Sequence, residues 1–283
     1  MSEVDCFIGV VSHEGSRFAI SQGPQGLAAF LRERFQGSGI GSLVQVNTRN
    51  LHDPDSLPID ASVVQETLSA ELRLQGEWAS YLRAGGSPSI VDAARSLVRT
   101  VRRATRRFRS PSPASVRRLV NIELSHLDLM RGGLASGAEW VLILEDDAFA
   151  PDLDDCARGL VALMRDCPAN IGYVNVSQSF TNAELGIEHL LSSVIAPAWD
   201  GSVRRSVLSA SRPVTNTVCA ILYRREFLSV LVEEMDALPM TPVVPIDWKL
   251  NIALMDLFES GRLRDGSCLL VEPAPIDQMS MRA

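Results

Sequence analysis

Three consecutive carboxylates, Glu145, Asp146 and Asp147, follow directly after an apolar run over residues 140–144. A buried strand that ends in three negative charges brings like charges together, and a bound divalent cation is the usual way to offset their repulsion. Carboxylate oxygens are ligands that Mg²⁺ and Mn²⁺ prefer, and these cations leave positions open for two phosphate oxygens. The segment therefore predicts a Mg²⁺ or Mn²⁺ site that also holds a diphosphate. The alternative interpretation is an acidic turn in which Asp146 or Asp147 caps the element that follows.

A second acidic candidate, Asp247, lies in the motif Pro245-Ile246-Asp247-Trp248, where a helix is predicted to start. An aspartate at this position commonly caps the helix. It could equally act as a general base that takes the proton from an attacking hydroxyl group. The neighbouring Trp248 either packs in the interior or stacks on a substrate. Both pairs of interpretations stay open.

Polar side chains also follow the first predicted strand, which covers residues 6–11. Ser12, His13 and Arg17 lie in the turn after this strand. In a parallel nucleotide-binding sheet the ligand sits beyond the carboxyl ends of the strands. We therefore expect Ser12, His13 and Arg17 to contact a nucleotide, although an exposed polar turn explains them nearly as well.

The order of predicted strands and helices around these residues indicates an α/β fold with a central, mostly parallel sheet flanked by helices. Predicted strands cover residues 6–11, 43–46, 139–144, 171–176, 217–223 and 268–271. Predicted helices cover residues 27–35, 60–82, 89–109, 113–131, 154–165, 225–235 and 246–259. Gly132-Gly133 is expected to end the helix before the carboxylate strand. Residues 177–213 are expected to form loops and irregular sheet around a short helix at 185–194.

The length fits one large α/β domain or two small ones, and we expect a single domain over residues 1–283. Of the 283 residues, 46% are hydrophobic, which is enough for a packed core. The apolar runs are far shorter than the roughly 18 to 20 residues that cross a bilayer, and residues 1–11 carry acids where a signal peptide needs positive charge. We therefore expect a cytoplasmic chain. Five scattered cysteines without a C-x-x-C motif are expected to be buried thiols and not a zinc site.

Residues 60–112 are expected to form a helical, arginine-rich insertion. Nine arginines and no acid lie between Arg95 and Arg118, although the whole chain has a net charge of −7. One interpretation is a merely solvated helix face. The other is a surface that contacts phosphates or an anionic membrane, because the arginines repel each other unless an anion joins them. Only one aromatic residue, Phe108, lies among them, so we expect no nucleic-acid partner.

Two neighbouring motifs resemble glycosyltransferase family 25, the lipopolysaccharide and collagen galactosyltransferase group. The first is the run from Glu123 to Met130, which contains Ser125-His126, and the second is the run from Gly137 to Ala148, which contains Ile-Leu-Glu-Asp-Asp. The match is close over residues 120–150 and looser over residues 215–226, 245–247 and 273–278. By itself His126 is a core histidine more often than a ligand, and the resemblance makes a position beside the site equally plausible.

The resemblance implies a GT-A fold, a nucleotide-sugar donor such as a UDP-sugar, and dependence on Mn²⁺ or Mg²⁺. The family's metal-binding acidic motif carries over onto Glu145, Asp146 and Asp147; we expect Glu145 and Asp147 to bind the metal, Asp147 most directly, and Asp146 to contact the donor. Asp277 or Gln278 would stand in place of a C-terminal metal-binding histidine. The expected reaction moves a hexose to a glycan or glycolipid hydroxyl with inversion, with Asp247 as the base. The arginine-rich helix has no counterpart in the family. It would either recruit an anionic lipid-linked acceptor at the inner face of a membrane or close over the donor diphosphate. The alternatives are a nucleotidyltransferase or phosphotransferase on a similar sheet, and a non-catalytic anion-binding module.

Overall fold

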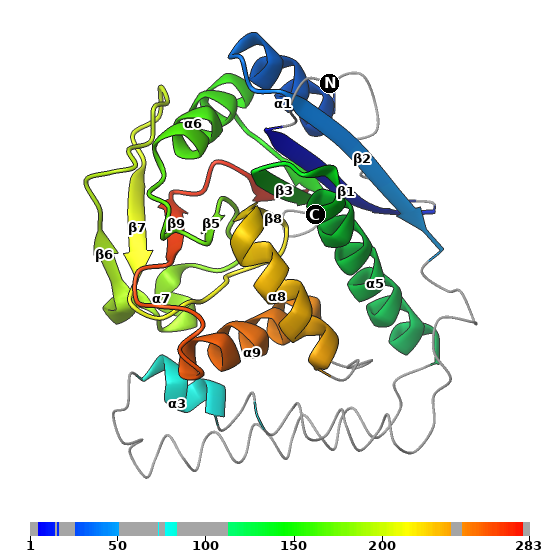
Figure 1. The fold of residues 1–283 in the computed structure, drawn as a ribbon, viewed down its shortest axis with the longest axis vertical. Coiled ribbons are helices and arrows are strands. Elements are labelled where there is room, and N and C mark those ends of the chain that lie inside the picture. The colour runs from blue at the N-terminus through cyan, green and yellow to red at the C-terminus, as the bar shows by residue number, and fades with distance from the viewer. Residues whose placement is uncertain are drawn as a thin grey trace.

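A computed structural model (Figure 1) describes residues 5–14, 16, 26–50, 73, 77–83, 113–238 and 245–279. Its elements, in chain order, are β1 (Cys6–His13), α1 (Leu27–Gly37), β2 (Ser42–Arg49), α3 (Ala79–Leu82), α5 (Pro113–Ser136), β3 (Trp140–Glu145), β4 (Ala148–Phe149), α6 (Leu153–Asp166), β5 (Tyr173–Asn175), α7 (Asn182–Leu185), η2 (Glu188–Leu190), β6 (Leu191–Ser193), β7 (Ser206–Ala210), β8 (Ala220–Arg224), α8 (Arg225–Ala237), α9 (Ile246–Glu259), β9 (Cys268–Glu272) and β10 (Asp277–Gln278). Arg17, the predicted helix at 89–109 and most of that at 60–82 lie outside the described residues. Within those residues, no helix is long and apolar enough to span a membrane.

The centre of the fold is an eight-stranded sheet with the order β2-β1-β3-β8-β5-β9-β7-β6. β1 runs parallel to β2 and β3, and β5 runs parallel to β9, whereas β8 and β7 are antiparallel to their neighbours. Six strands therefore run in one direction and two in the other. This confirms the predicted α/β fold with a mostly parallel central sheet.

Helices cover both faces of this sheet (Figure 1). On β1, Ile8 and Val10 belong to a core shared with α1 and α6, whereas Phe7 and Val11 belong to a core shared with α5, α8 and α9. Because both faces are buried there, the central strands β3 and β8 read as continuous apolar runs, unlike the outer strand β2. A polar residue directly after such an apolar run therefore marks the end of the strand at the edge of the sheet.

The helix before the carboxylate strand is longer than predicted. α5 continues through Gly132-Gly133 to Ser136 and ends at Gly137, whose φ of 76° suits a glycine. A Cβ atom on Gly133 would lie 2.7 Å from both methyl groups of Val141. The missing side chain lets α5 pack closely on β3, so this glycine serves packing and does not end the helix.

The predicted helix at 185–194 is wrong. The structure has a shorter helix, α7, which Thr181 and Glu184 cap reciprocally at its start. Gly186 follows with a φ of 69°, a left-handed conformation that ends the helix. Leu191 to Ser193 then pair with Leu208 to Ala210 as the outer strand β6. Non-local strand pairing outweighs the local helical pattern here.

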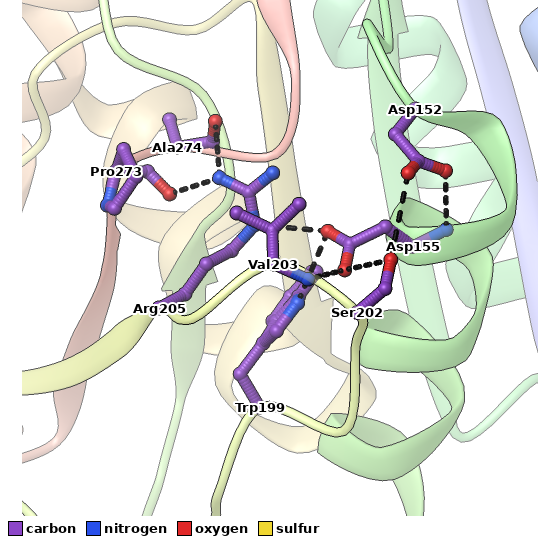
Figure 2. Close-up of polar contacts among 8 residues, drawn as sticks. All are labelled: Asp152, Asp155, Trp199, Ser202, Val203, Arg205, Pro273 and Ala274. Atoms are coloured by element: carbon purple, nitrogen blue, oxygen red, sulfur yellow. Dashed lines mark hydrogen bonds and ion pairs between the residues drawn. The ribbon is translucent and has the colours of Figure 1, made fainter.

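Asp155 on α6 is the centre of a buried polar network (Figure 2), and its side chain is 0% exposed. Its carboxylate accepts hydrogen bonds from the backbone N–H of Val203 at 2.8 Å and from Arg205 Nε at 3.0 Å. The indole N–H of Trp199 donates to the same carboxylate at 3.3 Å. Burial raises the pKa of Asp155, but the hydrogen bonds to Val203, Arg205 and Trp199 outweigh it, so the pKa lies below its usual range.

This network, the Asp155 clamp, ties three segments together. Arg205 donates through Nη1 to the carbonyl oxygens of Pro273 at 2.6 Å and Ala274 at 3.0 Å, shortly before β10 (Figure 2). A Cβ atom on Gly201 would lie only 2.1 Å from Asp155 Oδ1. Only glycine allows the chain to approach the carboxylate this closely. The clamp thus fixes the C-terminal segment against α6.

Asp155→Ala is expected to lower the free energy of unfolding by about 3 to 5 kcal/mol, because it leaves the buried guanidinium of Arg205 without its negatively charged partner. Asp152→Ala, which removes the N-cap of the same helix and a long hydrogen bond from Ser202 but leaves the Asp155–Arg205 pair, is expected to cost about 1 kcal/mol. Urea denaturation of both variants measures the difference.

The lowered pKa also sets the pH dependence. The stability contributed by Asp155 is present above the unfolded pKa of about 4 and is lost as pH falls through the lower folded pKa. The gap between the wild type and Asp155→Ala should therefore shrink only in acid. If Asp155→Ala were as stable as the wild type at neutral pH, the stabilising role of the Asp155 clamp would be contradicted.

Candidate active site

The predicted carboxylates lie at the edge of the sheet where β1 and β3 end. Glu145 is the last residue of β3, and its backbone N–H donates to the carbonyl oxygen of Cys219 at 2.9 Å. Asp146 and Asp147 form the turn into β4, and both are buried. One ligand atom each from Glu145, Asp147 and Cys219 lie within 4.8 Å of one another. We call Glu145, Asp146, Asp147 and Cys219 the acidic cluster.

Two histidines reach this cluster from different elements. His126 Nε2, on α5, lies 3.5 Å from Glu145 Oε1, and its side chain is 1% exposed. His13 Nε2, at the end of β1, lies 3.7 Å from Asp146 Oδ2. The structure therefore places His126 beside the site, one of the two positions expected from the sequence.

The C-terminal segment also reaches the cluster. β10 pairs with β4 so that Gln278 lies opposite Ala148. Gln278 Nε2 donates to Glu145 Oε2 at 3.3 Å, and Ser179 Oγ donates to Gln278 Oε1 at 2.8 Å. Asp277 lies close enough for its charge to raise the pKa of Cys219, after the larger effect of burial and alongside other carboxylates. The residues that the resemblance suggested as a replacement for a histidine thus border the cluster.

Asp247 lies in the first turn of α9. Burial, followed by the negative charge of Glu145, raises the pKa of Asp247 to about 6, against the lowering effects of backbone hydrogen bonds and of His126. Asp247 is thus close enough to Glu145 and His126 to respond to their charges. Its carboxylate also interacts with the backbone N–H groups of Asp247 and Trp248 in the first turn of α9, although the N-cap position itself is Pro245. Trp248 packs against Ile252, which favours the packing interpretation of this residue.

A buried ion pair connects the helix of Asp247 to the helix of His126. Lys249 Nζ on α9 contacts Glu123 Oε1 on α5, and both side chains are 2% exposed. Removing one partner of such a pair leaves a buried charge without compensation. The pair therefore fixes α9, and with it Asp247, relative to α5.

Of the three residues predicted to contact a nucleotide, the structure places some near the acidic cluster. Ser12 is 1% exposed, so it is not part of an exposed polar turn. His13 is partly exposed and reaches Asp146. Arg17 lies outside the described residues. The end of β1 thus lies next to the acidic cluster, as the predicted parallel sheet requires.

Sequence reasoning missed two features of the site. Cys219 was expected only to be a buried thiol, and all five cysteines are indeed free and buried. Its position opposite Glu145 depends on the antiparallel register of β3 and β8, which pairs Leu144 with Ala220. The Glu123–Lys249 pair was missed as well, although a single lysine among 27 basic residues was a signal that could have drawn attention to it.

The donor set fits a divalent cation. Asp146 Oδ2 and His126 Nε2 are buried atoms without a hydrogen-bond partner in the described part of the chain. The ion pairs that reach Glu145 and Asp146 from described residues come from His126 and His13 and need a protonated imidazole. Carboxylate oxygens suit Mg²⁺ or Mn²⁺, and a cation would offset the repulsion among them.

The chain shows similarity to solved structures, whereas no protein-family model and no curated protein matches it. One such structure is described as a "glycosyltransferase involved in the glycosylation of the major capsid of PBCV-1". The TM-score is 0.35 and the identity 10%, over 96% of this chain and 92% of that chain. None of these comparisons supports family 25 in particular. A similarity this weak assigns no activity, so the function proposed below rests on the geometry of the site.

Proposed function

We propose that the chain is a divalent-cation-dependent glycosyltransferase. It would move a hexose from a nucleotide sugar, a UDP-sugar, to a hydroxyl group of a glycan or glycolipid with inversion. The observation that carries this proposal is a carboxylate cluster at the end of β3 together with a further buried carboxylate that responds to its charge. Glu145 and Asp147 belong to a cluster that suits a cation, and the buried Asp247 lies close enough to respond to the charge of Glu145.

The carboxylates divide the chemistry between them. Glu145 and Asp147 hold the cation, which when bound would offset the negative charge of the departing diphosphate. Asp247 takes the proton of the acceptor hydroxyl. At the same time the hydroxyl oxygen bonds to the anomeric carbon of the donor, and the bond from that carbon to the diphosphate breaks. A raised pKa makes Asp247 a stronger base than an exposed aspartate.

The surrounding residues position these groups. His13 lies 3.7 Å from Asp146 and so brings the end of β1, with Ser12, to the place expected for the diphosphate. A contact of Arg17, which lies outside the described residues, with the nucleotide stays a prediction from the sequence. Gln278 donates to Glu145 and orients its carboxylate. The Glu123–Lys249 pair holds the start of α9 in place.

Thermal-shift measurements with UDP-, GDP- and TDP-sugars, each with and without Mn²⁺, test the proposal. A ligand that binds only the native state at about one hundred times its Kd adds about 2.7 kcal/mol of stability. We expect a rise in Tm with UDP-sugars only when Mn²⁺ is present. No stabilisation by any nucleotide sugar with the cation would contradict the proposal.

The products identify the reaction. Without an acceptor, a glycosyltransferase slowly hydrolyses its donor and releases free sugar and UDP. A nucleotidyltransferase releases pyrophosphate instead. Release of pyrophosphate from a nucleoside triphosphate and a sugar phosphate would replace the proposed activity with that one.

A further inference from the structure

Among the described residues, Cys219 is the one cysteine whose sulfur lies among carboxylate oxygens that could hold a metal ion. Its Sγ is within 4.8 Å of carboxylate oxygens of Glu145 and Asp147. The residue itself is 0% exposed, and its carbonyl oxygen accepts the backbone N–H of Glu145 at 2.9 Å. That backbone bond fixes Cys219 directly opposite the first carboxylate of the cluster.

A separate observation marks this place as a ligand site. His126 Nε2, on a side chain that is 1% exposed, points at Glu145 Oε1 from 3.5 Å and has no hydrogen-bond partner in the described part of the chain. Leaving a buried nitrogen unsatisfied costs free energy unless something binds beside it. His126 and Cys219 approach the same carboxylate from α5 and from the segment before β8.

We propose that Cys219 is a ligand of the cation at this site and makes the site prefer Mn²⁺ and softer cations, such as Zn²⁺ or Cd²⁺, over Mg²⁺. The inference rests on the proposed function, whose cation it specifies. Thiolate sulfur selects softer metals, whereas Mg²⁺ takes oxygen ligands almost exclusively. On binding, the S–H bond breaks, the sulfur–metal bond forms, and the proton passes to water.

The test uses the full chain and cations alone. Cd²⁺ or Co²⁺ bound to a thiolate produces a ligand-to-metal charge-transfer band, which oxygen ligands do not give. We expect this band in the wild type. We also expect it in Cys6→Ala, a matched control that removes another thiol with 0% exposure from the same sheet. The band should be absent from Cys219→Ala, which still binds the cation through its carboxylates.

Calorimetry of the same proteins measures selectivity. In Cys219→Ala we expect the Kd for Mn²⁺ to rise by at least the roughly 10- to 100-fold that loss of an outer-shell partner costs, while the Kd for Mg²⁺ changes much less. The wild-type spectrum needs no substitution, so an absent band overturns the role of Cys219 even if Cys219→Ala fails to fold.

The outcomes separate the two proposals. Cation binding by the wild type without a charge-transfer band, or an unchanged Mn²⁺ to Mg²⁺ preference in folded Cys219→Ala, would overturn the role of Cys219 and leave the cation site standing. No binding of any divalent cation by the wild type would overturn both. A band that persists in Cys219→Ala would assign the thiolate to another cysteine and overturn the inference.

Discussion

Asp147→Asn is expected to abolish Mn²⁺-dependent binding of the donor while the chain stays folded. Asp147 is 6% exposed and supplies one of the clustered ligand atoms. An amide oxygen is a far weaker ligand than a carboxylate for a hard cation. Removing one negative charge from a repulsive cluster costs little stability. The variant should therefore lose its affinity for Mn²⁺ while its free energy of unfolding stays near that of the wild type.

Calorimetric titration with Mn²⁺, followed by a UDP-sugar, measures this effect, and the unfolding midpoint reports the fold. Asp154→Asn is the matched control, because it makes the same chemical change on an exposed carboxylate that pairs with Arg34 on α1. It should bind Mn²⁺ like the wild type. Undiminished Mn²⁺ affinity in folded Asp147→Asn would remove Asp147 from the site.

Asp247→Asn is expected to lower the rate of transfer by about 10² to 10⁴-fold, the usual cost of losing a general base. Asparagine keeps the size of the side chain and an oxygen that accepts the backbone hydrogen bonds at the start of α9. Capping is therefore retained while proton transfer is lost. The affinity for the donor should barely change, so the loss appears in kcat.

The pH dependence gives a second measure of the same role. The pKa of Asp247 is raised to about 6 without a cation, and a nearby positive charge lowers it. The wild-type rate should therefore fall with decreasing pH at or below about 6, as the base becomes protonated. The residual rate of Asp247→Asn should lack this dependence.

Asp256→Asn serves as the control for this substitution. Asp256 lies on the same helix and pairs with Arg73, away from the acidic cluster. Its loss changes the charge of α9 without changing the base. Wild-type transfer by Asp247→Asn would show that Asp247 is only a helix cap.

Local patterns predicted the elements that bury a continuous face. The strand at 139–144 matches β3 within a residue, and the helix at 246–259 matches α9, because their apolar periodicities leave one arrangement for the backbone. The C-terminal strand β10 could not be found in this way. It has two residues, and it exists because Asp277 and Gln278 pair with β4 more than 120 residues earlier.

The residues of the candidate site also differ in whether a local sequence pattern could reveal them. Glu145, Asp146 and Asp147 were visible because three charges directly after an apolar strand are rare in one local segment. The approach of His126, Cys219 and Gln278 to Glu145 depends on how α5, β8 and β10 meet β3, which no local pattern contains. Their side chains also suit an interior position, so their types alone do not distinguish a ligand from a packed residue.

The buried Glu123–Lys249 pair gives the chain an internal reporter of conformational opening. Lys249 is the single lysine in the sequence, and its side chain is 2% exposed. An amine-acylating reagent therefore finds no lysine side chain to modify while α9 remains packed on α5. An opening that moves the start of α9 away from α5 would expose Lys249 and displace Asp247, two residues away. The rate of Lys249 acylation would thus report how often α9 separates from α5, without any added label.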